Sequence, residues 1–127
     1  MKKSTMLFLI LAVLITGLLI YFKYRDQKVQ IIYFTNEKCI VNYLTDKLVE
    51  QAKVDFGNRI NARTVVVSLY SGDPPDSPEV KQLREKYQVY GAPMIIINEK
   101  EFKKEYKYDP FKTEICKNFI IKPLVCL

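Results

Sequence analysis

Three cysteines, Cys39, Cys116 and Cys126, are the side chains of this 127-residue chain best suited to covalent chemistry. A cysteine reacts as its thiolate, so groups that stabilise the anion mark a reactive one. Cys39 stands where a β-branched and aromatic run ends and a segment with helical periodicity begins. Unpaired N–H groups at a helix N-terminus favour the thiolate, and the neighbouring Lys38 adds positive charge. Cys39 is therefore the candidate nucleophile; the alternative is a cysteine that only packs as a small hydrophobe.

The residue types that the chain lacks exclude several kinds of site. There is no histidine, so a Ser-His-Asp set cannot form. Three dispersed cysteines without histidine leave a tetrahedral metal site incomplete. The sequence also contains no glycine-rich phosphate-binding loop. We therefore expect neither a metal nor a cofactor.

Cys116 and Cys126 form the second candidate site. Cys116 lies in the last predicted helix, and Cys126 follows ten residues later, after Pro123 bends the chain back. In an exported domain, a disulfide between them would hold the tail against that helix and stabilise the fold by about 2–3 kcal/mol. We expect this structural disulfide; the alternative is a mobile tail that brings Cys126 to Cys39 as a resolving thiol.

The formal net charge of +6 is concentrated at the N-terminus. Residues 1–25 hold four basic and no acidic side chains, which leaves 16 basic and 14 acidic ones in residues 26–127. A nucleic-acid-binding face needs clustered basic residues, whereas the lysines of 100–107 are interleaved with glutamates. Such a run is typical of a solvated hairpin edge. We therefore expect no nucleic-acid partner.

An uncharged apolar run of seventeen residues, Met6–Phe22, lies near the N-terminus. A helix of about 17–25 apolar residues can cross the hydrocarbon core of a membrane. Aromatic residues at the end of the run, followed by Lys23 and Arg25, suit a membrane interface. We expect an uncleaved transmembrane signal-anchor over residues 1–25. The alternatives are a cleaved signal peptide, although the run is long and lacks a small-residue cleavage site, and a buried core helix.

Charge only weakly sets the side of the membrane on which residues 26–127 lie. Lys2, Lys3 and the amino terminus on one flank are balanced by Lys23, Arg25 and Lys28 on the other. A short basic N-terminus before an apolar run usually stays in the cytoplasm, while the following part is exported. We therefore expect a single-pass membrane protein with its domain on the extracytoplasmic side.

Alternating strand and helix signals fill residues 26–127. They predict the order β-α-β-α-β-β-α, in which the first βαβ unit makes parallel strands and the later hairpin adds antiparallel ones. The compact solution is an α/β fold, a mixed four-stranded sheet with helices on both faces. The expected strands are Val29–Thr35, Thr64–Tyr70, Met94–Asn98 and Glu101–Tyr108, and the expected helices are Cys39–Phe56, Pro78–Tyr87 and Phe111–Phe119.

Two motifs in this order resemble those of the thioredoxin-like superfamily. Phe34-Thr-Asn-Glu-Lys-Cys39 is similar to the aromatic-Thr-x-x-x-Cys entrance of thioredoxin-type and glutaredoxin-type domains. Val89-Tyr-Gly-Ala-Pro93 is similar to the family's Val-x-Gly-x-Pro segment, whose proline is cis and faces the active-site cysteine. The resemblance covers residues 29–121. It implies a thioredoxin-like three-layer fold, preceded here by one N-terminal transmembrane helix.

The resemblance is incomplete at the residues that matter for redox chemistry. The family's full motif is Cys-x-x-Cys, but here Asn42 replaces the resolving cysteine. Tyr33 stands at about the place where thioredoxins often keep a buried acid. A single motif cysteine can form a mixed disulfide but cannot release it as an internal disulfide. An alternative register has Asn36 as the helix N-cap, which makes Cys39 the second motif position.

The resemblance implies a membrane-tethered protein that acts on the thiols and disulfides of exported proteins. Cys39 would react by mixed-disulfide or isomerase-type chemistry, and the backbone of Ala92 and Pro93 would align an extended substrate beside it. The alternative is a redox-inactive interaction module. In that case the same groove binds an extended peptide or partner protein, and Cys39 only packs.

Overall fold

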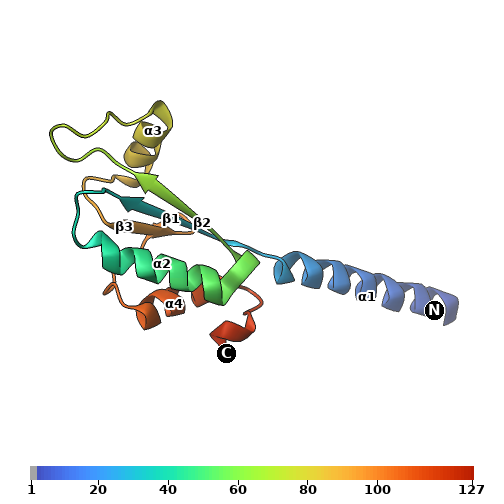
Figure 1. The fold of residues 1–127 in the computed structure, drawn as a ribbon. Coiled ribbons are helices and arrows are strands. Elements are labelled where there is room, and N and C mark those ends of the chain that lie inside the picture. Colours follow the sequence, from blue (N-terminus) through green and yellow to red (C-terminus); the bar gives the residue numbers. More distant parts are fainter. Residues whose placement is uncertain (1–2) are drawn as a thin grey trace.

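The computed structural model describes residues 3–127 as an α/β domain with one long helix projecting from it (Figure 1). In chain order, the elements are α1 (Lys3–Arg25), β1 (Val29–Thr35), α2 (Asn42–Phe56), the 3₁₀ turn η1 (Gly57–Arg59), β2 (Ile60–Val66), α3 (Pro78–Tyr87), β3 (Met94–Ile97), β4 (Lys100–Glu101), α4 (Tyr108–Lys117) and the 3₁₀ turn η2 (Leu124–Cys126). After the N-terminal helix, this is the predicted β-α-β-α-β-β-α order.

Helix α1 is apolar and stands free of the domain. Its 23 residues span about 35 Å at 1.5 Å per residue, enough to cross the hydrocarbon core. By length and composition it could cross a membrane, and none of its apolar window is buried within the protein. The alternative of a buried core helix is therefore wrong.

The sheet has the strand order β2-β1-β3-β4. Strand β1 pairs with β2 in parallel along its whole length, and with β3 in the antiparallel direction. Strands β3 and β4 form a short antiparallel hairpin. This mixed four-stranded sheet confirms the predicted fold class.

Strand β1 lies inside the sheet, between β2 and β3, and helices cover both faces of that sheet (Figure 1). Tyr33 points into a core shared with α2 and α4, and the next residue, Phe34, points into a smaller core covered by α3. This alternation is what a strand buried on both sides requires. The larger core contains Leu48, Phe56, Phe111 and Ile115, and the smaller one contains Val65, Val67, Val89 and Ile96. The three layers agree with the prediction.

Two predicted boundaries next to the candidate site are wrong. Helix α2 begins at Asn42 rather than Cys39, because the carbonyl of Asn36 accepts the amide of Cys39 in a turn. Strand β2 is Ile60–Val66 rather than Thr64–Tyr70, because its pairing with β1 ends at Val66. The residues after it form a loop held by aspartate side chains.

The last strand and helix also differ from the prediction. Strand β4 has two residues; just after it, the Phe102 amide still donates to the Ile95 carbonyl at 2.8 Å, and the Phe102 ring packs edge-on against Phe111 with ring centroids 5.5 Å apart. Helix α4 begins at Tyr108, so Asp109 and Pro110 lie in its first turn rather than before it. Both residues suit a first helical turn, through charge and fixed φ respectively.

Candidate functional site

Cys39 lies in the tight loop between β1 and α2. The backbone of Asn36 accepts the Cys39 amide at 3.0 Å, and the Cys39 carbonyl accepts the Asn42 amide at 3.2 Å. The side chain of Asn36 accepts the amide of Lys38 at 2.9 Å. Asn36 therefore forms the turn that carries Cys39 and is not the N-cap of α2. Cys39 stands three residues before the first helical residue.

The sulfur of Cys39 lies 3.6 Å from the carbonyl oxygen of Ala92. The peptide bond between Ala92 and Pro93 is cis. Pairing of β1 with β3 begins at Met94, so both residues lie just beyond the sheet. The hydroxyl of Tyr106 donates to the Pro93 carbonyl at 3.1 Å and so helps to hold the Ala92–Pro93 segment in place. The three residues expected to form the site, Cys39, Ala92 and Pro93, are thus neighbours.

The surface around the sulfur is apolar and open. Cys39 itself is half-buried, whereas Ile40 is 93% exposed and Tyr90 is 84% exposed. Val41 and Leu44 are exposed as well. Exposed apolar side chains beside a half-buried thiol suit contact with another protein chain.

Asn42 turns away from this surface into the domain. It is 7% exposed, and its side-chain amide donates to the carbonyl of Asn36. Its side-chain oxygen and the hydroxyl of Thr45 have no hydrogen-bond partner in the described part of the chain. The hydroxyl of buried Tyr33 reaches the Asn42 carbonyl at 3.4 Å, and burial raises the pKa of Tyr33 to about 12. No carboxylate or thiol takes the inner position, so Cys39 has no internal partner there.

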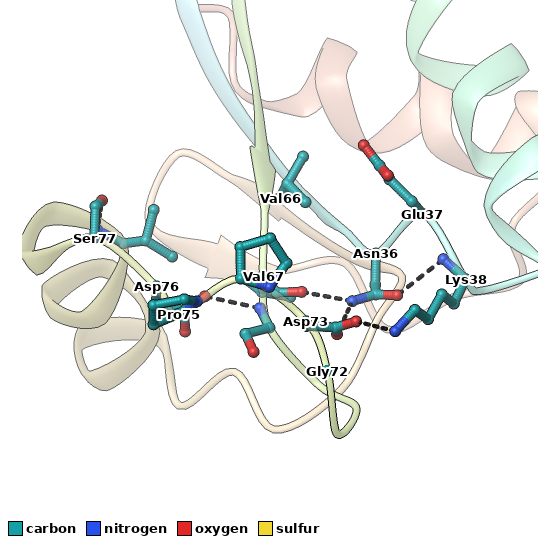
Figure 2. Close-up of a pocket in the computed structure, with 13 residues that line it drawn as sticks. Asn36, Glu37, Lys38, Val66, Val67, Gly72, Asp73, Pro75, Asp76 and Ser77 are labelled. Carbon is teal, nitrogen blue, oxygen red and sulfur yellow. Dashed lines mark hydrogen bonds and ion pairs between the residues drawn. The ribbon is translucent and has the colours of Figure 1, made fainter.

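The side chain of Lys38 forms an ion pair and is not a free positive charge. Its ammonium lies 2.6 Å from a carboxylate oxygen of Asp73, a residue of the loop after β2 (Figure 2). The carboxylate of Asp73 also accepts the amides of residues 69 and 70 and the side chain of Asn36. Lys38, followed by those backbone amides, holds the pKa of Asp73 well below its ordinary range. We expected the positive charge of Lys38 to favour the Cys39 thiolate, but Asp73 neutralises this charge.

A cavity of about 360 Å³ lies between the loops that follow β1 and β2 (Figure 2). Carboxyl ends of parallel strands are a common place for ligands in α/β sheets. Here Asn36 spans the two loops by donating to the Val67 carbonyl at 2.7 Å and to Asp73 at 2.8 Å. Cys39 is not part of the lining. The cavity is thus separate from the surface around the thiol, and its polar contacts hold the two loops together.

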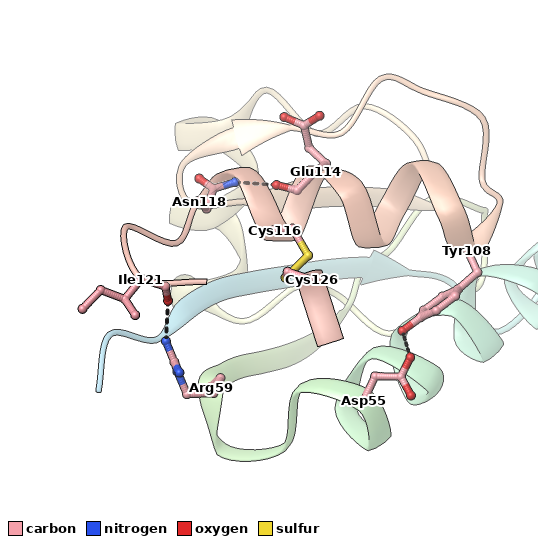
Figure 3. The surroundings of a disulfide bond; sticks show 8 residues. All are labelled: Asp55, Arg59, Tyr108, Glu114, Cys116, Asn118, Ile121 and Cys126. Carbon is pink, nitrogen blue, oxygen red and sulfur yellow. Dashed lines mark hydrogen bonds between the residues drawn. A yellow bond between two sulfur atoms is a disulfide. The ribbon is translucent and has the colours of Figure 1, made fainter. Parts of the chain in front are cut away.

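Cys116 and Cys126 form a disulfide, with Cα atoms 5.6 Å apart, that joins α4 to η2 (Figure 3). Nearby, the side chain of Gln27 donates to the Asn118 carbonyl, which places this part of the domain where β1 begins. Cys39 follows the other end of β1 and is the free cysteine of the described residues. In this oxidised state Cys126 is already paired and cannot resolve a bond at Cys39.

No protein-family model and no curated protein matches the chain. A solved structure described as "Structure of a malarial protein" aligns with a TM-score of 0.49 and 17% identity, over 75% of this chain and 100% of that chain. A thioredoxin from Wuchereria bancrofti aligns with a TM-score of 0.47 and 21% identity, over 65% of this chain and 70% of that chain. The fold class itself rests on the order of the elements and of the strands in the sheet.

Two residues that hold the segments next to Cys39 and Pro93, namely Tyr106 and Asp73, carry no clear signal in the sequence. Tyr106 reaches Pro93 across 13 positions, and no local pattern predicts that contact. Asp73 lies in a loop dense in turn formers, where an aspartate is expected only to bond its own backbone. Within residues 3–127, no group of three or more potential metal-ligating side chains gathers.

Proposed function

We propose that this chain is a membrane-tethered thioredoxin-like protein that acts on the thiols and disulfides of exported proteins through Cys39. The observation that carries the proposal is the position of the sulfur, 3.6 Å from the Ala92 carbonyl and among exposed apolar residues. An extended substrate lying along the backbone of Ala92 and Pro93 would bring a sulfur atom next to Cys39.

The chemistry that fits one motif cysteine is disulfide isomerisation. The Cys39 thiolate attacks one sulfur of a substrate disulfide; the substrate bond breaks, and the second substrate sulfur leaves as a thiolate. Another substrate thiolate then attacks the mixed disulfide, forms a new substrate disulfide and releases Cys39 as a thiolate. The number of disulfides is unchanged, so no external oxidant or reductant takes part. Because Asn42 occupies the place of the resolving thiol, the substrate itself must supply the second attack.

The tether in this proposal is α1. Residues 1–25 would form the anchor, and residues 26–127 the domain. The apolar character of α1 and its lack of burial support a membrane span. The Cys116–Cys126 disulfide supports an oxidising, extracytoplasmic compartment, because such bonds persist mainly there.

Trapping of a mixed disulfide tests the reaction. The detergent-solubilised full chain is mixed with a secreted protein whose disulfides have been scrambled, and conjugates are separated by non-reducing electrophoresis. We expect a thiol-sensitive conjugate with the native chain and none with Cys39→Ser. The double variant Cys116→Ser/Cys126→Ser keeps the candidate nucleophile and is expected to form the conjugate still. Equal conjugate from Cys39→Ser would refute the proposed role of Cys39.

A redox-inactive interaction module is the second candidate. It is favoured by two observations: Asn42 replaces the second thiol, and Ile40 and Tyr90 are widely exposed beside the sulfur. An apolar surface at that place can bind an extended segment without covalent chemistry. The two candidates differ in one result, since binding to the module would survive Cys39→Ser but fall in Ile40→Ser.

A further inference from the structure

We propose that the end of the domain next to α1 lies against the membrane and binds anionic phospholipid headgroups. This inference rests on the proposed membrane tether. It adds a lipid-binding surface, defined by Arg25, Lys28, Arg59, Ile120 and Lys122, which we call the basal surface.

The junction between α1 and the domain is short and fixed. Only residues 26–28 separate α1 from β1. The side chain of Gln27 donates to the Asn118 carbonyl at 3.1 Å and accepts the Ile120 amide at 3.2 Å. Three residues extend at most about 10 Å, so a membrane-embedded α1 keeps this end of the domain at the headgroup layer.

Arg59 also links this junction to the domain, through two hydrogen bonds. Its guanidinium donates to the Gln27 carbonyl at 3.3 Å and to the Ile121 carbonyl at 3.2 Å, the latter shown in Figure 3. It also lies over the ring of Phe119, 4.9 Å from the centroid. Segments that are far apart in sequence are therefore joined into one face, and this face follows α1 directly in the chain.

The chemistry of the basal surface fits an anionic lipid layer. A hollow of about 250 Å³ is lined by Arg25, Asp26, Lys28, Asn58 and Arg59, so three cations face one carboxylate. That carboxylate, of Asp26, is paired with Arg25 at 3.0 Å. Basic residues next to a membrane span are attracted by the negative surface potential of anionic lipids.

The basal surface also carries an apolar group that suits the headgroup boundary. The side chain of Ile120 is 63% exposed, although its amide is held by Gln27. Lys122, two residues on, is exposed as well. An apolar side chain flanked by lysine and arginine is the pattern of interfacial membrane contact.

With the basal surface against the membrane, the distance of Cys39 from the lipid is fixed by the length of β1. Seven residues of β1 at about 3.3 Å each put the Cys39 loop about 20 Å beyond the basal surface. The apolar surface around the thiol would then face the aqueous phase, where exported proteins fold. Substrates would approach from the side away from the lipid.

Tryptophan reporters test the inference, because the chain contains no tryptophan. Three variants of the full chain, Leu11→Trp, Ile120→Trp and Tyr90→Trp, are reconstituted into vesicles of phosphatidylcholine brominated near the headgroup, with or without phosphatidylglycerol. We expect quenching of the reporter in α1 in both vesicles. The reporter at position 120 should be quenched about twofold, mainly with phosphatidylglycerol, and the one at position 90 should not be quenched.

Charge reversal identifies the source of the binding. In the Ile120→Trp background, Lys28→Glu/Lys122→Glu should abolish the quenching, whereas Lys47→Glu/Lys81→Glu, with the same change in charge on exposed residues of α2 and α3, should leave it. Quenching at position 11 but not at position 120 overturns the basal surface and leaves the tether standing. Loss of quenching at position 11 as well overturns the tether. Equal quenching at position 120 without phosphatidylglycerol overturns the anionic preference.

Discussion

The sulfur of Cys39 and the carbonyl oxygen of Ala92 lie 3.6 Å apart, although 53 positions separate them in the chain. The register of the central strands produces this contact, because Phe34 at the end of β1 pairs with Met94 at the start of β3. The residues just beyond each strand are therefore brought together. The candidate site is thus a consequence of sheet pairing.

The first prediction concerns the missing resolving thiol. Asn42→Cys places a second thiol three residues after Cys39, where it can attack the mixed disulfide and expel the substrate. We expect most of the trapped conjugate to disappear. Asn42→Ser, of similar size but without a thiol, should retain it. Native levels of conjugate in Asn42→Cys would show that the inner position does not reach the sulfur.

The second prediction concerns the disulfide between α4 and η2. Cys116→Ser/Cys126→Ser should lower the free energy of unfolding of the full chain by about 2–3 kcal/mol, because the unfolded chain loses a cross-link. Urea denaturation followed by circular dichroism measures the change. Cys39→Ser is the control and should leave the urea midpoint nearly unchanged. A double variant as stable as the native chain would contradict a stabilising disulfide.

The third prediction follows from the lowered pKa of Asp73. At neutral pH, Asp73→Asn should destabilise the domain, because Lys38 loses its partner and two loop amides lose a carboxylate. As the pH falls below the ordinary aspartate value of 3.8, the unfolded chain takes up a proton first, so the advantage of the native chain shrinks. Urea midpoints of both chains at about pH 7 and about pH 3 measure this. A stability gap that widens in acid would contradict the assigned direction.

The fourth prediction concerns Tyr33, whose pKa is raised to about 12 chiefly by burial. The unfolded chain ionises this phenol near the ordinary value of 10.0, whereas the folded chain resists ionisation. The stability tied to the neutral phenol is therefore complete below that value and is lost as the pH rises towards about 12. Tyr33→Phe should show a smaller alkaline loss of stability than the native chain. Identical alkaline profiles, measured by thermal unfolding, would refute the shift.

The sequence predicts those elements whose limits are set locally. Helix α3 runs over Pro78–Tyr87 as expected, because Ser77 caps it by accepting the Val80 amide at 3.3 Å and proline starts it. Strand β1 also has its predicted limits, since a buried β-branched run has few alternatives. In both cases the signal lies within a few residues.

The predictions that failed depend on distant partners or on competition within a turn. The turn built by Asn36 takes the amides that would otherwise begin α2, so periodicity alone places the helix start too early. The ion pair of Lys38 with Asp73 joins two loops and has no local signature. The contact of Tyr106 with Pro93 likewise forms only when β3 and the following segment fold together.

The central claim is that Cys39 is an accessible nucleophile, and its exchange with a small aromatic disulfide tests that most directly. With Cys116 and Cys126 oxidised, the folded full chain has one thiol to react among its described residues. On addition of dithiodipyridine, we expect one equivalent of thiopyridone to be released from the folded chain without denaturant, and none from Cys39→Ser. Release that occurs only after denaturant is added would mean that Cys39 is packed and inert, and would contradict the proposed chemistry.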